Sequence, residues 1–204
     1  MVTVSTLKST SRGYHHGDLR SALIDAGMNA LESAPLEDIS LRQIAREVGV
    51  SATAVYRHFP DKRALLAAVA HEGFERLGAA QFAAAEATAP AMRFAASGRA
   101  YVRFALANPA LFRLIFTYGE QFTDDNRDNL AARLLRAQTT EQRHGDPDEA
   151  ERLSLQAWAL VHGLAMLMLD GRVTADEALI DRVIDPATLF IAQPRPGSSN
   201  EESP

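Results

Sequence analysis

The chain has 204 residues, contains no cysteine and carries a formal net charge of −5. With 47% hydrophobic and 23% charged residues, its composition is that of a soluble globular protein. The missing cysteines exclude disulfide bonds and thiolate metal sites. The start of the chain lacks the apolar block of a signal peptide. The apolar run AWALVHGLAMLML is interrupted by His162 and Gly163 and is too short to cross a bilayer, so we expect a cytoplasmic protein.

Positive charge is concentrated in one short segment of this acidic chain. Residues 1–63 hold eight Lys/Arg and seven Asp/Glu, a net charge of +1, and the remainder carries −6. Within residues 39–63, five basic residues face two acidic ones, a net charge of +3. Attraction of phosphate depends on local charge within about 8 Å at physiological salt, so the acidic total does not exclude nucleic acid. The alternative is an ordinary solvated helix face.

The chain begins with a polar segment, residues 1–13, which we expect to be a disordered arm. A first helix follows, because apolar residues recur at helical spacing at Leu19, Leu23, Ala26 and Ala30. In a DNA-binding protein Arg12 of the arm could enter the minor groove. The adjacent His15 and His16 would lie on different faces of a helix, so they do not form a zinc site by themselves.

The next helix has a clear start signal. Ser40 followed by Gln43 forms a capping box, and Ile39 and Ile44 are placed to act as the hydrophobic staple around it. The sequence therefore predicts a helix that begins at about Leu41.

This helix is short and a second one follows it closely. Gly49 stands where a left-handed residue ends a helix, Ser51 can cap the next one, and Pro60 stops that helix. The spacing predicts a helix-turn-helix with a turn of about four residues. Its predicted apolar side comprises Ile44, Ala45, Val48, Val50, Val55 and Phe59. Its predicted outward side comprises Arg42, Arg46, Ala52, Thr53, Arg57 and Lys62.

The remaining chain also reads as helix, so the predicted fold class is all-α with about nine helices. The predicted domains are a helix-turn-helix domain at residues 14–60 and a larger helical domain at residues 61–192. Residues 193–204 are rich in Pro, Gly and Ser and are expected to form a disordered tail.

The segment ISLRQIAREVGVSATAVYRHFPDKRALLAAV resembles the DNA-binding segment of the tetracycline-repressor (TetR) family of bacterial transcription regulators. The resemblance spans about residues 14–75. In that family a Tyr-x-His/Tyr-Phe element and an x-Lys-x-x-Leu-Leu run close the recognition helix and open the next helix. The matching residues here are Tyr56, His58, Phe59, Lys62, Leu65 and Leu66.

The resemblance implies that the second short helix enters the major groove of DNA. Ala52 and Thr53 would then meet base edges, and Arg57 could reach guanine. Tyr56, His58 and Lys62 match positions that usually hold phosphates, and Arg42 would add a phosphate contact near a helix N-terminus. Tyr56 and Phe59 could equally be mainly core residues, and His58 could serve as much to cap the turn as to bind DNA. The implied DNA-binding set is Arg42, Ser51, Ala52, Thr53, Tyr56, Arg57, His58 and Lys62.

Two later segments, NPALFRLIF and AWALVHGL, resemble a ligand-binding type of C-terminal domain in this family, known by a Trp-His-Gly signature. The resemblance implies an apolar or aromatic effector. The candidate effector-binding residues are Tyr101, Phe104, Phe112, Phe116, Trp158 and His162. A stripe of aromatic residues is more often core than pocket, and His162 could simply bond a backbone carbonyl.

The family forms homodimers through its last two long helices, expected here at about residues 147–169 and 174–184. The apolar seams expected on them are Leu153, Ala157, Leu160, Leu164, Leu179 and Val183. The implied function is a ligand-responsive repressor that binds a palindromic operator. The chain shows no nucleophile elbow, phosphate loop or His-Glu-x-x-His motif, so we expect neither an enzyme nor a cofactor or metal. The alternative function is a DNA-binding dimer whose C-terminal domain binds no effector.

Overall fold

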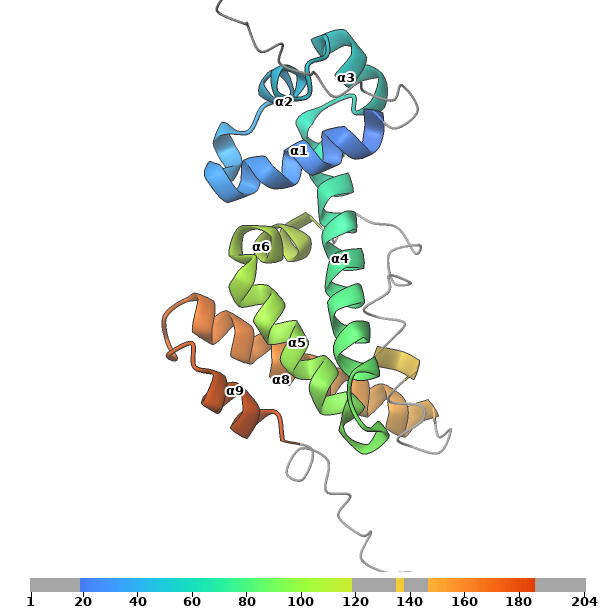
Figure 1. The fold of residues 1–204 in the computed structure, drawn as a ribbon, viewed down its shortest axis with the longest axis vertical. Helices are drawn as coiled ribbons and strands as arrows, with labels where there is room; N and C mark the ends of the chain where they lie inside the picture. Colours follow the sequence, from blue (N-terminus) through green and yellow to red (C-terminus); the bar gives the residue numbers. More distant parts are fainter. Residues whose placement is uncertain (1–18, 119–134, 138–146, 186–204) are drawn as a thin grey trace, which may run out of the picture. The chain divides into compact units, whose positions relative to one another are not determined.

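The computed structural model describes residues 19–118, 135–137 and 147–185, and these residues form helices and no β-strand. The predicted all-α fold class is confirmed (Figure 1). The predicted arm and tail, with Arg12, His15 and His16, lie outside the described residues. The helices are α1 (Leu19–Ser33), η1 (Leu36–Asp38), α2 (Leu41–Val48), α3 (Ala52–His58), α4 (Lys62–Glu86), η2 (Pro90–Met92), α5 (Arg93–Ala107), α6 (Pro109–Tyr118), α8 (Pro147–Leu169) and α9 (Glu177–Val183).

The chain divides into two compact units, residues 1–65 and 66–204. The division falls inside α4, which begins in the first unit and continues in the second. The division therefore lies within a helix and not at the loop around Pro60, because α4 contributes side chains to the cores of both units.

In the first unit, local capping determines where α2 and α3 begin and end. The Ser40 hydroxyl accepts a hydrogen bond from the Gln43 backbone N–H at 3.2 Å, and the Ser51 hydroxyl accepts one from the Ala54 N–H at 3.2 Å. Gly49 has φ +78°, a left-handed conformation that glycine adopts without steric cost. Both predicted starts are confirmed, although the turn contains three residues rather than four.

The apolar faces of α1, α2, α3 and the start of α4 form the core of the first unit. Ile44, Val55 and Leu65 are fully buried, and Ile39 and Phe59 are nearly so. The guanidinium carbon of Arg20 lies 5.4 Å from the centre of the Phe59 ring, within the range of a cation–π contact. Phe59 is therefore a core residue that fixes the end of α3.

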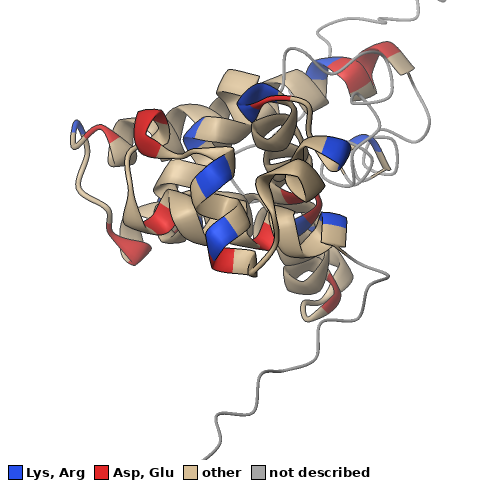
Figure 2. Cartoon of the chain, turned by 90° about the horizontal axis from the view of Figure 1, so that it is seen from above, with Lys and Arg blue, Asp and Glu red and all other residues tan. Residues whose placement is uncertain are grey.

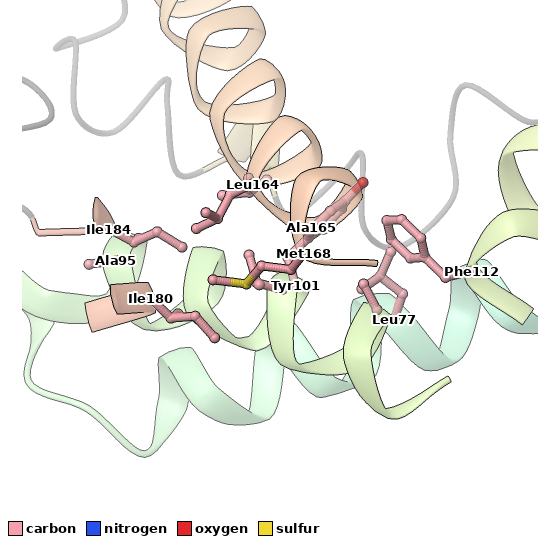
Figure 3. Packing of buried hydrophobic residues seen from close by; sticks show 12 residues of the cluster. Leu77, Ala95, Tyr101, Phe112, Leu164, Ala165, Met168, Ile180 and Ile184 are labelled. Carbon is pink, nitrogen blue, oxygen red and sulfur yellow. The ribbon is translucent and has the colours of Figure 1, made fainter. Parts of the chain in front are cut away.

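The second unit is built around α5 and α8, which pack along each other. Its core is a cluster of buried side chains from α4, α5, α6, α8 and α9, among them Leu77, Phe112, Ala165 and Ile180 (Figure 3). At Gly73 of α4, an added Cβ would lie 2.9 Å from side-chain atoms of Ile115 and Leu111. The absence of a side chain at this position thus allows α6 to approach α4 closely.

Helix α8 buries one face and leaves an apolar face uncovered. By length and composition this helix could cross a membrane, which corrects the expectation that its apolar run is too short. The core helix of a soluble protein can have the same length and composition. Of the expected seam residues, Leu153, Ala157 and Leu164 are buried inside the unit. The others are half-buried: Leu160, Leu179 and Val183. The stripe that remains accessible has residues four apart, and we call it the α8 stripe: Leu155, Ala159, Gly163 and Leu167.

Helix α9 is shorter than expected. The Asp176 carboxylate accepts hydrogen bonds from the backbone N–H groups of Ala178 and Leu179, so α9 begins at Glu177 rather than at residue 174. It ends at Val183 and so has only seven residues. The sequence pattern indicated a longer helix because Thr174 and Ala175 can both be accommodated in a helix. The N-cap at Asp176 outweighs this weak tendency and determines where α9 begins.

Candidate functional site

Helix α3 presents a polar face to solvent. Thr53, Tyr56, Arg57 and His58 all have exposed side chains, and we call them the reading face. Tyr56 is 48% exposed, which places it on this face and not in the core. Figure 2 shows Lys and Arg positions in blue among the other residues of the helices. Exposed aromatic and basic side chains on a short helix offer hydrogen bonds and positive charge to a nucleic acid.

The preceding helix adds two basic side chains. Arg42 and Arg46 of α2 are exposed, whereas the apolar residues of α2 face α1 and α3. Ala52 is only half-exposed, and the Ser51 hydroxyl already accepts the capping hydrogen bond of α3. Ser51 can still donate its own proton, because a hydroxyl both accepts and donates.

Lys62 takes part in a contact that sequence spacing did not indicate. Its Nζ donates to the carbonyl oxygen of Leu36 at 2.5 Å and to that of Glu37 at 2.9 Å. These carbonyls belong to η1, whose last backbone acceptors need partners because a helix end leaves them unsatisfied. An ammonium group has three protons, so one remains for another acceptor. The partners are 25 and 26 residues away in the sequence, and no local pattern predicts such a contact.

Five of the six candidate effector residues lie together in the second unit. Tyr101 of α5, Phe112 and Phe116 of α6, and Trp158 and His162 of α8 form what we call the aromatic cluster. The His162 ring centre lies 4.5 Å from that of Phe116, 5.7 Å from Phe112 and 6.0 Å from Trp158. Tyr101 packs edge-on against Phe112 at 5.5 Å.

The aromatic cluster contains one polar contact. The Tyr101 hydroxyl lies 3.0 Å from Nδ1 of His162. Burial raises the pKa of Tyr101. Burial also lowers the pKa of His162 below its ordinary value. At neutral pH the cluster therefore contains a protonated tyrosine and a neutral imidazole.

The cluster extends from the core to the surface of the unit. Phe112 is fully buried, Tyr101 is 4% exposed, and Trp158 is 44% exposed. An exposed tryptophan next to buried aromatic rings gives an apolar molecule a surface on which to bind. Within the described parts of the chain, no group of three or more His, Cys, Asp or Glu residues could hold a metal ion.

Comparison with known families assigns both units. Residues 23–69 match the model described as "Bacterial regulatory proteins, tetR family", and residues 94–187 match "Tetracyclin repressor-like, C-terminal domain". The two matches together cover more than half of the chain and contain the reading face and the aromatic cluster. The chain belongs to the TetR family.

Individual relatives agree with this assignment to the TetR family. An uncharacterized HTH-type transcriptional regulator of Mycobacterium tuberculosis is 28% identical, and the alignment covers 80% of this chain and 82% of the relative. A solved structure of a protein of unknown function from Rhodococcus sp. RHA1 is 37% identical with a TM-score of 0.71, covering 87% of this chain and 95% of that one. A TetR family regulator from Marinobacter aquaeolei has the same fold at 21% identity, a TM-score of 0.63 and coverage of 82% and 92%.

TetR family membership makes the chain a transcriptional regulator with a helix-turn-helix DNA-binding domain.

The aromatic cluster differs from the expected effector-binding set at two aromatic residues. Phe104 packs against the core cluster, but its ring is not among those that contact His162. Phe74 of α4, which was not among the candidate effector residues, packs edge-on against Phe116 at 5.6 Å. Its helical spacing alone could not distinguish it from other core residues.

Proposed function

We propose that the protein is a cytoplasmic, ligand-responsive repressor that binds a palindromic operator as a homodimer and is released by a small apolar effector. The DNA-binding part of this proposal rests on one observation: α3, a helix capped at both ends, exposes the reading face. The cap at Ser51 and the buried Phe59 hold α3 rigidly, so its outward side chains keep a fixed spacing. Fixed spacing is what the reading of base edges requires.

The exposed side chains of the first unit divide into two proposed roles. Thr53 and Arg57, with Ala52 beside them, lie on the helix that would enter the major groove and read bases. Arg42, Tyr56 and His58 would hold phosphates, together with the Ser51 hydroxyl and the remaining proton of Lys62. Phosphate contacts supply affinity without sequence preference, whereas the base contacts supply specificity.

Dimerisation is proposed to use the α8 stripe, because Leu153, Ala157 and Leu164 of the seam that the sequence indicated are buried inside the unit. Leu155 is 61% exposed and Leu167 is 46% exposed, so burial against a second copy would remove substantial apolar surface from water. An added Cβ at Gly163 would meet nothing within 4 Å, which leaves room for a second helix to approach. Two recognition helices also read more base pairs than one, which a palindromic site needs.

The aromatic cluster is the proposed effector site, and α4 is the proposed route to the DNA-binding unit. Phe74 of α4 contacts the cluster through Phe116, and the first residue of the same helix is Lys62. A ligand that shifts α4 would change the spacing of the two recognition helices in the dimer. DNA affinity and ligand affinity are then coupled by about 1–3 kcal/mol, the usual size for linked sites.

A DNA-binding dimer without an effector is the second candidate. The full burial of Phe112 and the near-complete burial of Tyr101 favour it, since these rings already fill the core. In that case the C-terminal unit would serve only as a dimerisation scaffold.

Thermodynamic linkage between effector binding and DNA binding distinguishes the two candidate functions. A panel of planar and acyl compounds is screened for changes in Trp158 fluorescence, and each compound that changes it is tested against DNA binding. The responsive repressor requires at least one compound that changes Trp158 emission and weakens DNA binding together. If compounds never change both signals, the C-terminal unit is a scaffold.

A further inference from the structure

The hydrogen bond within the aromatic cluster has a definite direction. Tyr101 is buried, and a buried hydroxyl proton without an acceptor costs about 1–3 kcal/mol. Among the described residues, Nδ1 of His162 is the acceptor within reach of this hydroxyl, at 3.0 Å. The indole of Trp158, the other polar group of the aromatic cluster, carries only a donor. Tyr101 therefore donates a hydrogen bond to Nδ1 of His162.

This direction fixes the tautomer of His162. A neutral imidazole carries one proton, so a ring that accepts at Nδ1 has its hydrogen on Nε2. The ring stays neutral at pH 7 because burial lowers its pKa. Tyr101 and His162 thus form a chain of donors whose final N–H is that of Nε2.

Aromatic rings pack around the imidazole of His162 that carries this final donor. The Phe116 ring centre is 4.5 Å from that of His162, and the Trp158 ring centre is 6.0 Å away. A donor among apolar rings gains most from an acceptor brought by a molecule that also covers those rings. Phe116 is half-buried and Trp158 is partly exposed, so such a molecule can reach them from the surface.

We propose that the effector has an apolar aryl or acyl body and one oxygen acceptor, a carbonyl or carboxylate oxygen, that receives the hydrogen bond from Nε2 of His162. The body packs against Phe116 and Trp158, and the oxygen selects the ligand. A protonated amine fits poorly because it brings only donors to a donor. This inference rests on the proposed effector function and adds its ligand class.

The first test measures the tautomer without any ligand. Long-range ¹H–¹⁵N correlation NMR on the full chain with ¹⁵N-labelled histidine shows which ring nitrogen carries the proton, and the His162 signals are assigned by their loss in His162→Gln. The expected result is the Nε2–H tautomer in the wild type and a mixture of tautomers in Tyr101→Phe, which keeps the ring and removes the hydroxyl. A proton on Nδ1 of the wild type would overturn the inference.

The second test compares two ligands of equal shape, 2-acetylnaphthalene and 2-isopropenylnaphthalene, which differ by a carbonyl oxygen in place of a CH₂ group. Trp158 is the only tryptophan, so its single indole N–H cross-peak reports binding. Hydrophobic transfer favours the alkene, and a preference for the ketone must therefore come from the hydrogen bond. We expect the ketone to bind roughly threefold to tenfold more tightly to the wild type.

The matched variant is His162→Leu, which removes the donor and keeps an apolar side chain. It should bind both compounds and lose the preference for the ketone, with its thermal unfolding as the check that it folds. A ketone preference that survives in His162→Leu, or tighter binding of the alkene to the wild type, contradicts the assigned ligand class. If neither compound moves the Trp158 cross-peak, the effector site itself is refuted, and the tautomer measurement separately decides the direction of the hydrogen bond.

Discussion

Lys62 donates a hydrogen bond of 2.5 Å to the carbonyl oxygen of Leu36 and thereby connects the start of α4 to η1. A second bond, to the carbonyl oxygen of Glu37 at 2.9 Å, completes this attachment. The lysine lies four residues beyond the end of α3. Its ammonium group therefore positions the elements around the reading face in addition to the phosphate contact proposed for it.

Replacing Lys62 by alanine should destabilise the first unit. The substitution removes two hydrogen bonds from a charged donor, and we expect a loss of about 1–2 kcal/mol in the free energy of unfolding, measured by urea denaturation. The control is Arg42→Ala, whose exposed side chain should contribute within about 0.5 kcal/mol. Arg42→Ala should instead lower the salt dependence of DNA binding by about one unit. Unchanged stability of Lys62→Ala would show that the contact with η1 does not position α4.

Thr53 should determine sequence preference at one symmetric base position. Its side chain is exposed in the first turn of α3, where recognition helices meet base edges. We expect Thr53→Ala to change discrimination at that position by about 1–3 kcal/mol and to leave non-specific affinity within a few-fold. The measurement is a comparison of the sites that the variant and the wild type select. Identical selected sites would remove Thr53 from the reading residues.

Substitutions in the α8 stripe should separate dimerisation from folding. Gly163→Arg adds a charged side chain where the structure has space, so the monomer should fold while the second copy is excluded. We expect sedimentation to give the mass of a monomer for this variant and of a dimer for the wild type. Ala157→Arg serves as the contrast, because Ala157 is buried in the unit and the variant should lose helical structure. A dimeric Gly163→Arg would place the interface elsewhere.

Stability should fall as the solution becomes acidic, with a contribution from His162. Burial lowers the pKa of His162 in the folded state, so the unfolded chain takes up the proton first as pH decreases. The stabilising contribution is complete above the ordinary pKa of about 6.5 and is lost as pH falls through the lowered folded value. We expect the urea midpoint to drop between pH 7.5 and pH 5 and to drop less in His162→Leu. An equal drop in both proteins would show that His162 does not titrate differently on folding.

The sequence predicted the features of the fold that depend on interactions between residues close together in the chain. Ser40, Gly49 and Ser51 act on backbone groups within a few residues of themselves, and they gave the limits of α2 and α3 correctly. The spacing of four between Trp158 and His162 likewise placed both on one side of α8. Their contact with each other follows from helix geometry alone.

Contacts between distant residues could not be predicted in the same way. The bond from Lys62 to Leu36 and the bond from Tyr101 to His162 depend on how helices pack, which periodicity does not specify. Periodicity showed that α8 is apolar, but several of its faces are apolar. Only packing against α5 distinguishes the buried positions, such as Ala157, from the exposed α8 stripe.

Selection of bound duplexes from a random-sequence pool tests the central claim most directly. The full chain is used to enrich DNA over several rounds, and the enriched pool is sequenced. Two reading faces related by dimer symmetry should give an inverted repeat, with half-sites whose centres are about one helical turn apart or a multiple of it. A pool without an enriched motif, or a motif that lacks an inverted repeat, would contradict the account of α3 as the reader of a palindromic operator.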